Sequence, residues 1–65
     1  MKPIQLIENK VRVEFYYANT QKTRVEIFDL CDNEQRREMG RQCAIHQSFA
    51  GNRITSEVIS AVPLH

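Results

Sequence analysis

Apolar and polar residues alternate strictly over residues 10–17, Lys-Val-Arg-Val-Glu-Phe-Tyr-Tyr. A period of two with β-branched and aromatic residues predicts a strand that is buried on one side only. The side that faces the core would carry Val11, Val13, Phe15 and Tyr17. The open side would carry Lys10, Arg12, Glu14 and Tyr16.

A second strand is predicted over residues 23–29, after the polar segment 18–22. A short connection between two such strands favours an antiparallel hairpin, and the lack of glycine favours a loop of about three to five residues. Val25 and Ile27 are expected to face the core. The open side of this strand would then carry Arg24, Glu26 and Phe28.

The period changes to that of a helix over residues 32–50. Asp32 or Asn33 can cap its first turn, and the pair Gly51-Asn52 is typical of a helix end. One face, spaced by four, three and four residues, carries Met39, Cys43, His46 and Ala50, flanked by Gln42 and Phe49. The opposite face carries Glu34, Arg37 and Arg41. This pattern predicts an amphipathic helix packed on the sheet.

Two more strands are predicted near the ends of the chain. Residues 53–62 are rich in β-branched residues, which favours a strand over a short helix capped by Thr55, and Pro63 would end it. Residues 3–7 are apolar enough to form an edge strand, with a turn at residues 8–10.

The predicted order is β(β)βαβ, one α+β domain over residues 1–65, with one helix on one face of an antiparallel sheet of three to four strands. Its expected core consists of Val11, Val13, Phe15, Val25, Ile27, Met39, Cys43, Phe49 and Val58.

A chain of 65 residues can bury only a thin core, so reinforcement by disulfides, a metal or a second copy is to be expected. The 9 basic and 8 acidic residues nearly cancel, which disfavours a dedicated DNA-binding domain. The two cysteines and the absence of an export signal in residues 1–10 predict a cytoplasmic protein with reduced thiols. No apolar run is long enough to cross a membrane.

The sequence contains no motif of a known catalytic class, so no enzyme activity and no cofactor are expected. Cys43 and His46 lie three residues apart and are the candidate for a thiol or metal site. Both fall on the predicted core face, which favours simple packing. Together with Cys31 and His65 they would make four possible zinc ligands, but their spacing matches no zinc-binding motif. We therefore predict no metal.

Aromatic and arginine side chains on the predicted open face indicate a contact surface for a protein partner, with a homodimer as the expected form. The predicted partner-binding residues are Arg12, Tyr16, Arg24, Phe28, Arg37 and Arg41. The alternative is a single-stranded nucleic-acid-binding domain that uses the same face together with Arg36, Arg37 and Arg41. Glu14 and Glu26 would repel phosphate there, which makes the protein partner the favoured prediction.

The element order and the length resemble those of small phage-encoded inhibitors of host proteins. This resemblance concerns size and layout alone, so no residue roles transfer from it. It implies a regulator or inhibitor encoded by a phage or another mobile element.

Overall fold

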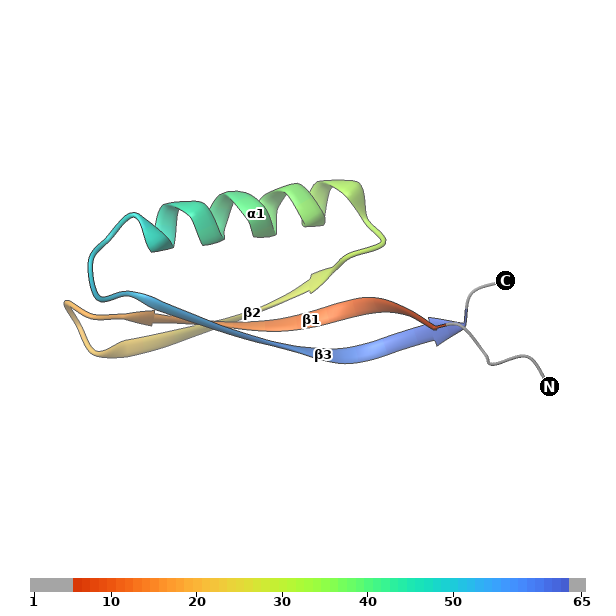
Figure 1. Ribbon diagram of the computed structural model, residues 1–65, viewed down its shortest axis with the longest axis horizontal. Helices are drawn as coiled ribbons and strands as arrows, with labels where there is room; N and C mark the ends of the chain where they lie inside the picture. Colours follow the sequence, from red (N-terminus) through yellow and green to blue (C-terminus); the bar gives the residue numbers. More distant parts are fainter. Residues whose placement is uncertain (1–5, 64–65) are drawn as a thin grey trace.

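The computed structural model describes residues 6–63. Its elements are β1 (Leu6–Tyr17), β2 (Lys22–Asp29), α1 (Asn33–Gln47) and β3 (Arg53–Pro63). The three strands form one antiparallel sheet in the order β2-β1-β3, and α1 covers one of its faces (Figure 1). The predicted α+β architecture is confirmed. The molecule is long and narrow, with extents of 51 × 21 × 14 Å.

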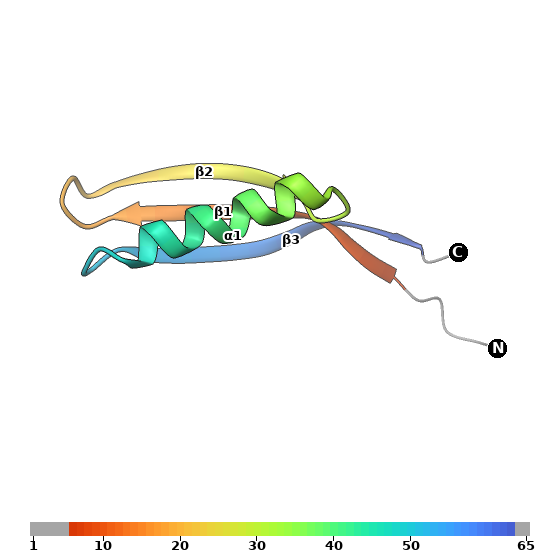
Figure 2. The same cartoon turned by 90° about the horizontal axis from the view of Figure 1, so that it is seen from above.

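β1 is a single long strand, so the predicted turn at residues 8–10 is wrong. Leu6 and Ile7 belong to β1 itself and pair with β3; residues 3–5 lie outside the described residues. The pairing between β1 and β3 shifts register between Glu8 and Val11. Such β-bulges bend and twist the strands locally. In Figure 2, this end of β1 and β3 extends past the start of α1.

The loop between β1 and β2 has four residues, Ala18–Gln21, because Tyr17 pairs directly with Lys22. The N–H of Gln21 donates to the carbonyl oxygen of Tyr17 at 2.8 Å, and Gln21 takes a left-handed conformation with φ 56°. The loop predicted from the sequence extends one residue further, to Lys22. One residue fewer in the loop exchanges the two faces of β2 relative to β1, because side chains alternate along a strand.

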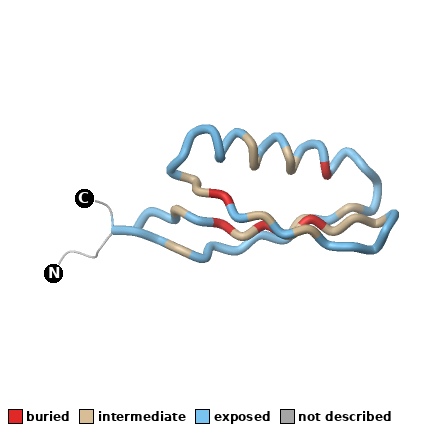
Figure 3. Tube along the Cα trace, turned by 180° about the vertical axis from the view of Figure 1, so that it is seen from behind, coloured by how far each residue is buried: buried red, intermediate tan, exposed pale blue. Residues whose placement is uncertain are grey.

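The core therefore differs from the predicted one on β2. Its buried residues are Val11, Val13, Phe15 and Phe28 (Figure 3). Phe28 is only 4% exposed, whereas Val25 and Ile27 are 44% and 55% exposed. The predictions that Val25 and Ile27 face the core and that Phe28 faces solvent are wrong. Each side chain lies on the opposite face because Val11 pairs with Phe28.

α1 begins and packs as the sequence predicts, but it ends earlier. Asp32 is the N-cap and accepts hydrogen bonds from the N–H groups of Glu34 and Gln35. Met39 and Cys43 pack against the core, and His46 is buried. The helix stops at Gln47 rather than residue 50, so the chain turns away before Phe49, which is 62% exposed and does not join the core.

β3 confirms the predicted strand and pairs within the chain, antiparallel to β1. Its Ile54 packs against the core. Val58, predicted to be buried, pairs with Val11 but is 45% exposed, because β3 is an edge strand beyond the cover of the helix at that point.

Candidate functional site

The face of the sheet opposite α1 is open. Residues paired across antiparallel strands share a face, so the pairing fixes its members. They are Arg12, Glu14 and Tyr16 on β1, Thr23, Val25 and Ile27 on β2, and Arg53, Thr55 and Glu57 on β3. This face combines apolar, aromatic and charged side chains and has no cover in the described part of the chain.

The apolar part of the open face lies along β2. Val25 and Ile27 are two residues apart, and Tyr16 lies diagonally across from Val25 on β1. We call these three residues the β2 stripe. The Tyr16 ring is held by Arg53, whose guanidinium carbon lies 4.6 Å from the ring centroid, a cation–π geometry. Two exposed β-branched side chains beside a half-buried aromatic ring are typical of contact surfaces.

The charges of the open face are paired next to the β2 stripe. Arg12 forms an ion pair with Glu14 on its own strand and approaches Glu57 of β3 at 4.0 Å. Glu14 and Glu57 thus both lie beside Arg12, which was predicted to contact a partner. This part of the face consequently offers alternating charges and no net positive potential.

Arg24 lies on the helix side, not on the predicted open side. Its Nε donates to the Tyr17 hydroxyl at 3.0 Å, and its Nη1 donates to Glu26 at 2.7 Å. Its guanidinium carbon lies 4.4 Å from the centroid of the Phe15 ring. The hydrogen bond to Tyr17 is the main cause that raises the pKa of Arg24 above its ordinary value. Arg24 thus stays charged and is held in one position.

Arg37 and Arg41, the other predicted contact residues, are exposed on α1. Arg41 forms an ion pair with Glu38, and its hydrogen bond lowers the pKa of that carboxyl. The structure therefore brings together Arg12 and Tyr16 on the open face. Arg24, Arg37 and Arg41 lie on the helix side, and Phe28 is in the core.

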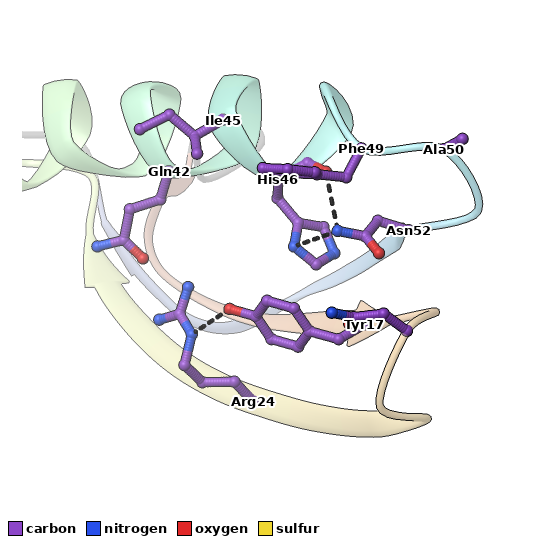
Figure 4. A pocket seen from close by; sticks show the side chains of 9 residues that line it. Tyr17, Arg24, Gln42, Ile45, His46, Phe49, Ala50 and Asn52 are labelled. Atoms are coloured by element: carbon purple, nitrogen blue, oxygen red, sulfur yellow. Dashed lines mark hydrogen bonds between the residues drawn. The ribbon is translucent and has the colours of Figure 1, made fainter.

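A groove of about 700 Å³ opens between the end of α1 and the β1–β2 hairpin (Figure 4). The sequence pattern does not predict this groove, because the groove depends on where the helix ends. Its lining includes Tyr17, Arg24, Gln42, Ile45, His46 and Phe49. The oxygen of the Gln42 amide is buried there without a hydrogen-bond partner, and Ile45 and Phe49 form an apolar wall.

His46 is a packing residue at the base of this groove. Its ring meets the rings of Phe15 and Tyr17 edge to face, with centroids 5.2 and 4.8 Å away. Nε2 lies 3.0 Å from the carbonyl oxygen of Arg53, and Nδ1 lies 3.4 Å from the amide nitrogen of Asn52. A carbonyl only accepts and an amide nitrogen only donates, so these contacts favour the neutral ring with its proton on Nε2.

Cys43 lies partly buried against the core, one helical turn from His46. Burial raises the pKa of its thiol, which weakens it as a nucleophile. Within residues 6–63, no cluster of three or more histidine, cysteine or acidic side chains could hold a metal ion. Both ring nitrogens of His46 also have partners within the fold.

The sequence matches no family model, and comparisons with curated proteins and with solved structures find no match. In the described part of the chain, the helix is neither long nor apolar enough to cross a membrane. The function must therefore be inferred from the residues and their geometry.

Proposed function

We propose that this chain is a small protein–protein interaction module that binds its partner through the open face of the sheet. The observation that carries the proposal is the exposure of Val25 and Ile27, 44% and 55%, on a face with no cover in residues 6–63. Burying such side chains against a partner contributes about 25 cal/mol per Å² of apolar surface. Tyr16 and Arg12 lie beside them and belong to the residue types enriched at binding hot spots.

The arrangement of charges favours a protein partner over a single-stranded nucleic acid. Bases stack on aromatic platforms beside cations that contact phosphate. Phe28 is buried, so Tyr16 lacks the second aromatic that sequence analysis placed beside it. Arg12 is paired with Glu14, which would repel phosphate.

The proposal extends to the setting in which the module works. Cys31 and Cys43 are both free thiols, which supports a reducing compartment such as the cytoplasm. A module of this size with a binding face and no catalytic motif suits a regulator or an inhibitor of another protein, such as one encoded by a phage or mobile element.

The proposal is tested by affinity capture with the tagged chain as bait in an extract of its source cells. The face variant combines Tyr16→Ser with Ile27→Ser. The matched control combines Ile45→Ser with Phe49→Ser, which removes two apolar side chains at the helix end that are 51% and 62% exposed. Co-capture of an untagged second copy of the chain is scored separately from capture of other proteins.

We expect at least one protein to bind the wild type and the control but to be lost, by tenfold or more, with the face variant. That loss corresponds to about 1.4 kcal/mol or more, typical of hot-spot residues. Equal capture by all three baits would contradict the proposal, provided that circular dichroism shows all three to be folded.

A further inference from the structure

The outer edge of β2 carries backbone groups that point away from the sheet. The N–H of Leu30 donates to the carbonyl oxygen of Asn9 across the β1–β2 pair. Backbone groups alternate in direction along a strand, so the N–H groups of Thr23, Val25 and Ile27 point to the free edge. The N–H of Asp29 agrees with this alternation, because the Gln35 side chain accepts its hydrogen bond at 2.7 Å from outside the strand.

The other edge of the sheet, β3, is protected in two ways that β2 is not. β3 contains a register shift opposite Lys10, and its last residue is Pro63, which has no N–H to donate. β2 is paired regularly with β1 along its whole length and contains no proline. In Figure 2, α1 crosses over the Asp29 end of β2 and leaves the hairpin half of this edge clear. An unprotected edge of this kind is a template for another strand.

We propose that a second copy of this chain pairs with this edge, β2 against β2, antiparallel and centred on Val25. In this register Val25 lies opposite Val25 of the partner subunit, and Thr23 lies opposite Ile27 of the partner subunit. Each outward N–H then meets an outward carbonyl, and the two helices lie on the same side of a continuous six-stranded sheet.

The side chains on the helix side of β2 favour this register. Arg24 lies opposite Glu26 of the partner subunit, at a position where the backbones allow the closest side-chain approach. In the single chain these two side chains already pair with each other and are 38% and 42% exposed. The junction would therefore bring two such pairs side by side, with opposite charges facing each other between the copies. Moving the centre to Glu26 would instead set two glutamates face to face.

On the opposite side, the pairing joins the β2 stripes of both copies into one apolar surface at the centre of the wider sheet. This inference rests on the proposed binding function and names a second copy as one partner of the chain. In the joined sheet, the exposed Val25 and Ile27 would lie at its centre rather than at an edge.

The test combines solution mass with a backbone variant. Multi-angle light scattering over a range of concentrations should show a dimer for the wild type. Val25→Pro removes an outward N–H, which an edge strand tolerates without loss of its own pairing. We expect this variant to keep its circular dichroism spectrum and to become monomeric.

A disulfide scan fixes the register and does not depend on the proline variant. In a Cys31→Ser background, Val25→Cys should cross-link two copies on mild oxidation, since directly opposite Cα atoms lie about 5.5 Å apart, within disulfide range. The control is Ile59→Cys, equally exposed at 45% but on β3, which should not cross-link.

A monomeric wild type at every concentration would overturn the inference, and capture of a different protein would still support the proposed function. A dimer that cross-links no better through residue 25 than through residue 59 would also overturn it, because the copies would then meet elsewhere. Loss of capture with the face variant, in contrast, bears on the proposed function alone.

Discussion

Asn52 holds the end of α1 by donating from its side-chain amide to the carbonyl oxygen of His46 at 3.1 Å. The same nitrogen lies 3.4 Å from Nδ1 of the His46 ring. On its other side, the Asn52 oxygen accepts the N–H of Ala18 in the β1–β2 loop at 2.9 Å. One amide thus joins the helix end, the connection to β3 and the hairpin.

Removal of this amide should destabilise the fold. In Asn52→Ala, the N–H of Ala18 and the carbonyl of His46 lose partners in a partly buried place, which costs about 1–3 kcal/mol. A domain of this length has a total stability of roughly 3–10 kcal/mol, so the loss is large. Urea denaturation followed by circular dichroism measures it. Asn19→Ala, at an exposed loop position, is the control, and an equal effect of both variants would contradict the role of Asn52.

The two glycines should respond to alanine with opposite signs. At Gly51, φ is +83° and an added Cβ would lie 2.9 Å from the Cβ of Ala18, so Gly51→Ala should lower the melting temperature. At Gly40, within α1, an added Cβ meets nothing within 4 Å. Gly40→Ala should therefore raise the stability by up to about 1 kcal/mol through helix propensity. Differential scanning calorimetry of both variants checks this; a fall in stability for Gly40→Ala would show that the helix packs more closely there than described.

The exchange of faces on β2 predicts a large contrast between neighbouring residues. Phe28→Ala removes a buried ring and should cost about 3–5 kcal/mol, a large share of the total stability of roughly 3–10 kcal/mol. Ile27→Ala removes a half-exposed side chain and should leave the unfolding midpoint nearly unchanged. The comparison is made by thermal melts of dilute protein, where association does not contribute. Equal losses would mean that β2 pairs in the register that the sequence alone suggests.

The alternation of residues predicted where the strands lie but not which face of β2 is buried. Either face of β2 fits the pattern as the buried one. Val25 and Ile27 on one face are apolar enough for a core, and so is Phe28 on the other face. The choice depends on the hairpin loop, where Gln21 takes a left-handed conformation that residues other than glycine and asparagine rarely adopt. A loop of five residues would have given the expected face.

The sequence pattern likewise does not predict that α1 ends at Gln47, and it therefore does not predict the groove. Phe49 continues the apolar spacing of the helix, so the periodicity extends past Gln47. The helix stops because Ser48 closes it, with hydrogen bonds to the carbonyl of Ile45, and Asn52 then bonds back to His46. The periodicity of apolar residues gives no sign of these hydrogen bonds, because they involve polar side chains and backbone groups.

The two cysteines should differ sharply in reactivity. Cys31 is exposed before α1, whereas Cys43 packs against the core and burial raises the pKa of its thiol. Brief treatment with iodoacetamide at neutral pH should modify Cys31 alone, as read by mass spectrometry of peptides. Both should react in urea. Fast modification of Cys43 in the folded protein would contradict its place in the core.

The Cys43 thiol should also make the free energy of unfolding depend on pH in the alkaline range. Because the pKa of Cys43 is higher in the folded chain than in the unfolded chain, folding favours the protonated form. The contribution of the protonated thiol to stability is fully present below the pKa of Cys43 in the unfolded chain, about 8.5. It is lost as the pH rises through the pKa of Cys43 in the folded chain. The urea midpoint should therefore fall above about pH 8.5, and less so in Cys43→Ala. An identical pH profile for both would contradict the shift.

The pairing of Arg24 with Glu26 of the partner subunit can be tested by exchange of charge. Arg24→Glu alone would bring four carboxylates together at the junction, and Glu26→Arg alone would bring four guanidinium groups together. Each variant should associate at least tenfold more weakly than the wild type, about 1.4 kcal/mol. Mixed in equal amounts, the two variants have opposite charges across the junction again. A heterodimer should then form, visible by native mass spectrometry when one variant carries a mass tag.

The mixture separates pairing across the junction from the contacts of Arg24 within its own chain. Arg24→Glu also loses the hydrogen bond to Tyr17 and the contact with the Phe15 ring, so its monomer should be less stable by itself. That loss is the same with or without the second variant, whereas recovery of association requires charges that meet between copies. Salt should weaken the heterodimer, since half-exposed ion pairs are screened. If the two variants stay folded but remain monomeric when mixed, Arg24 makes contacts only within its own chain and the proposed pairing is wrong.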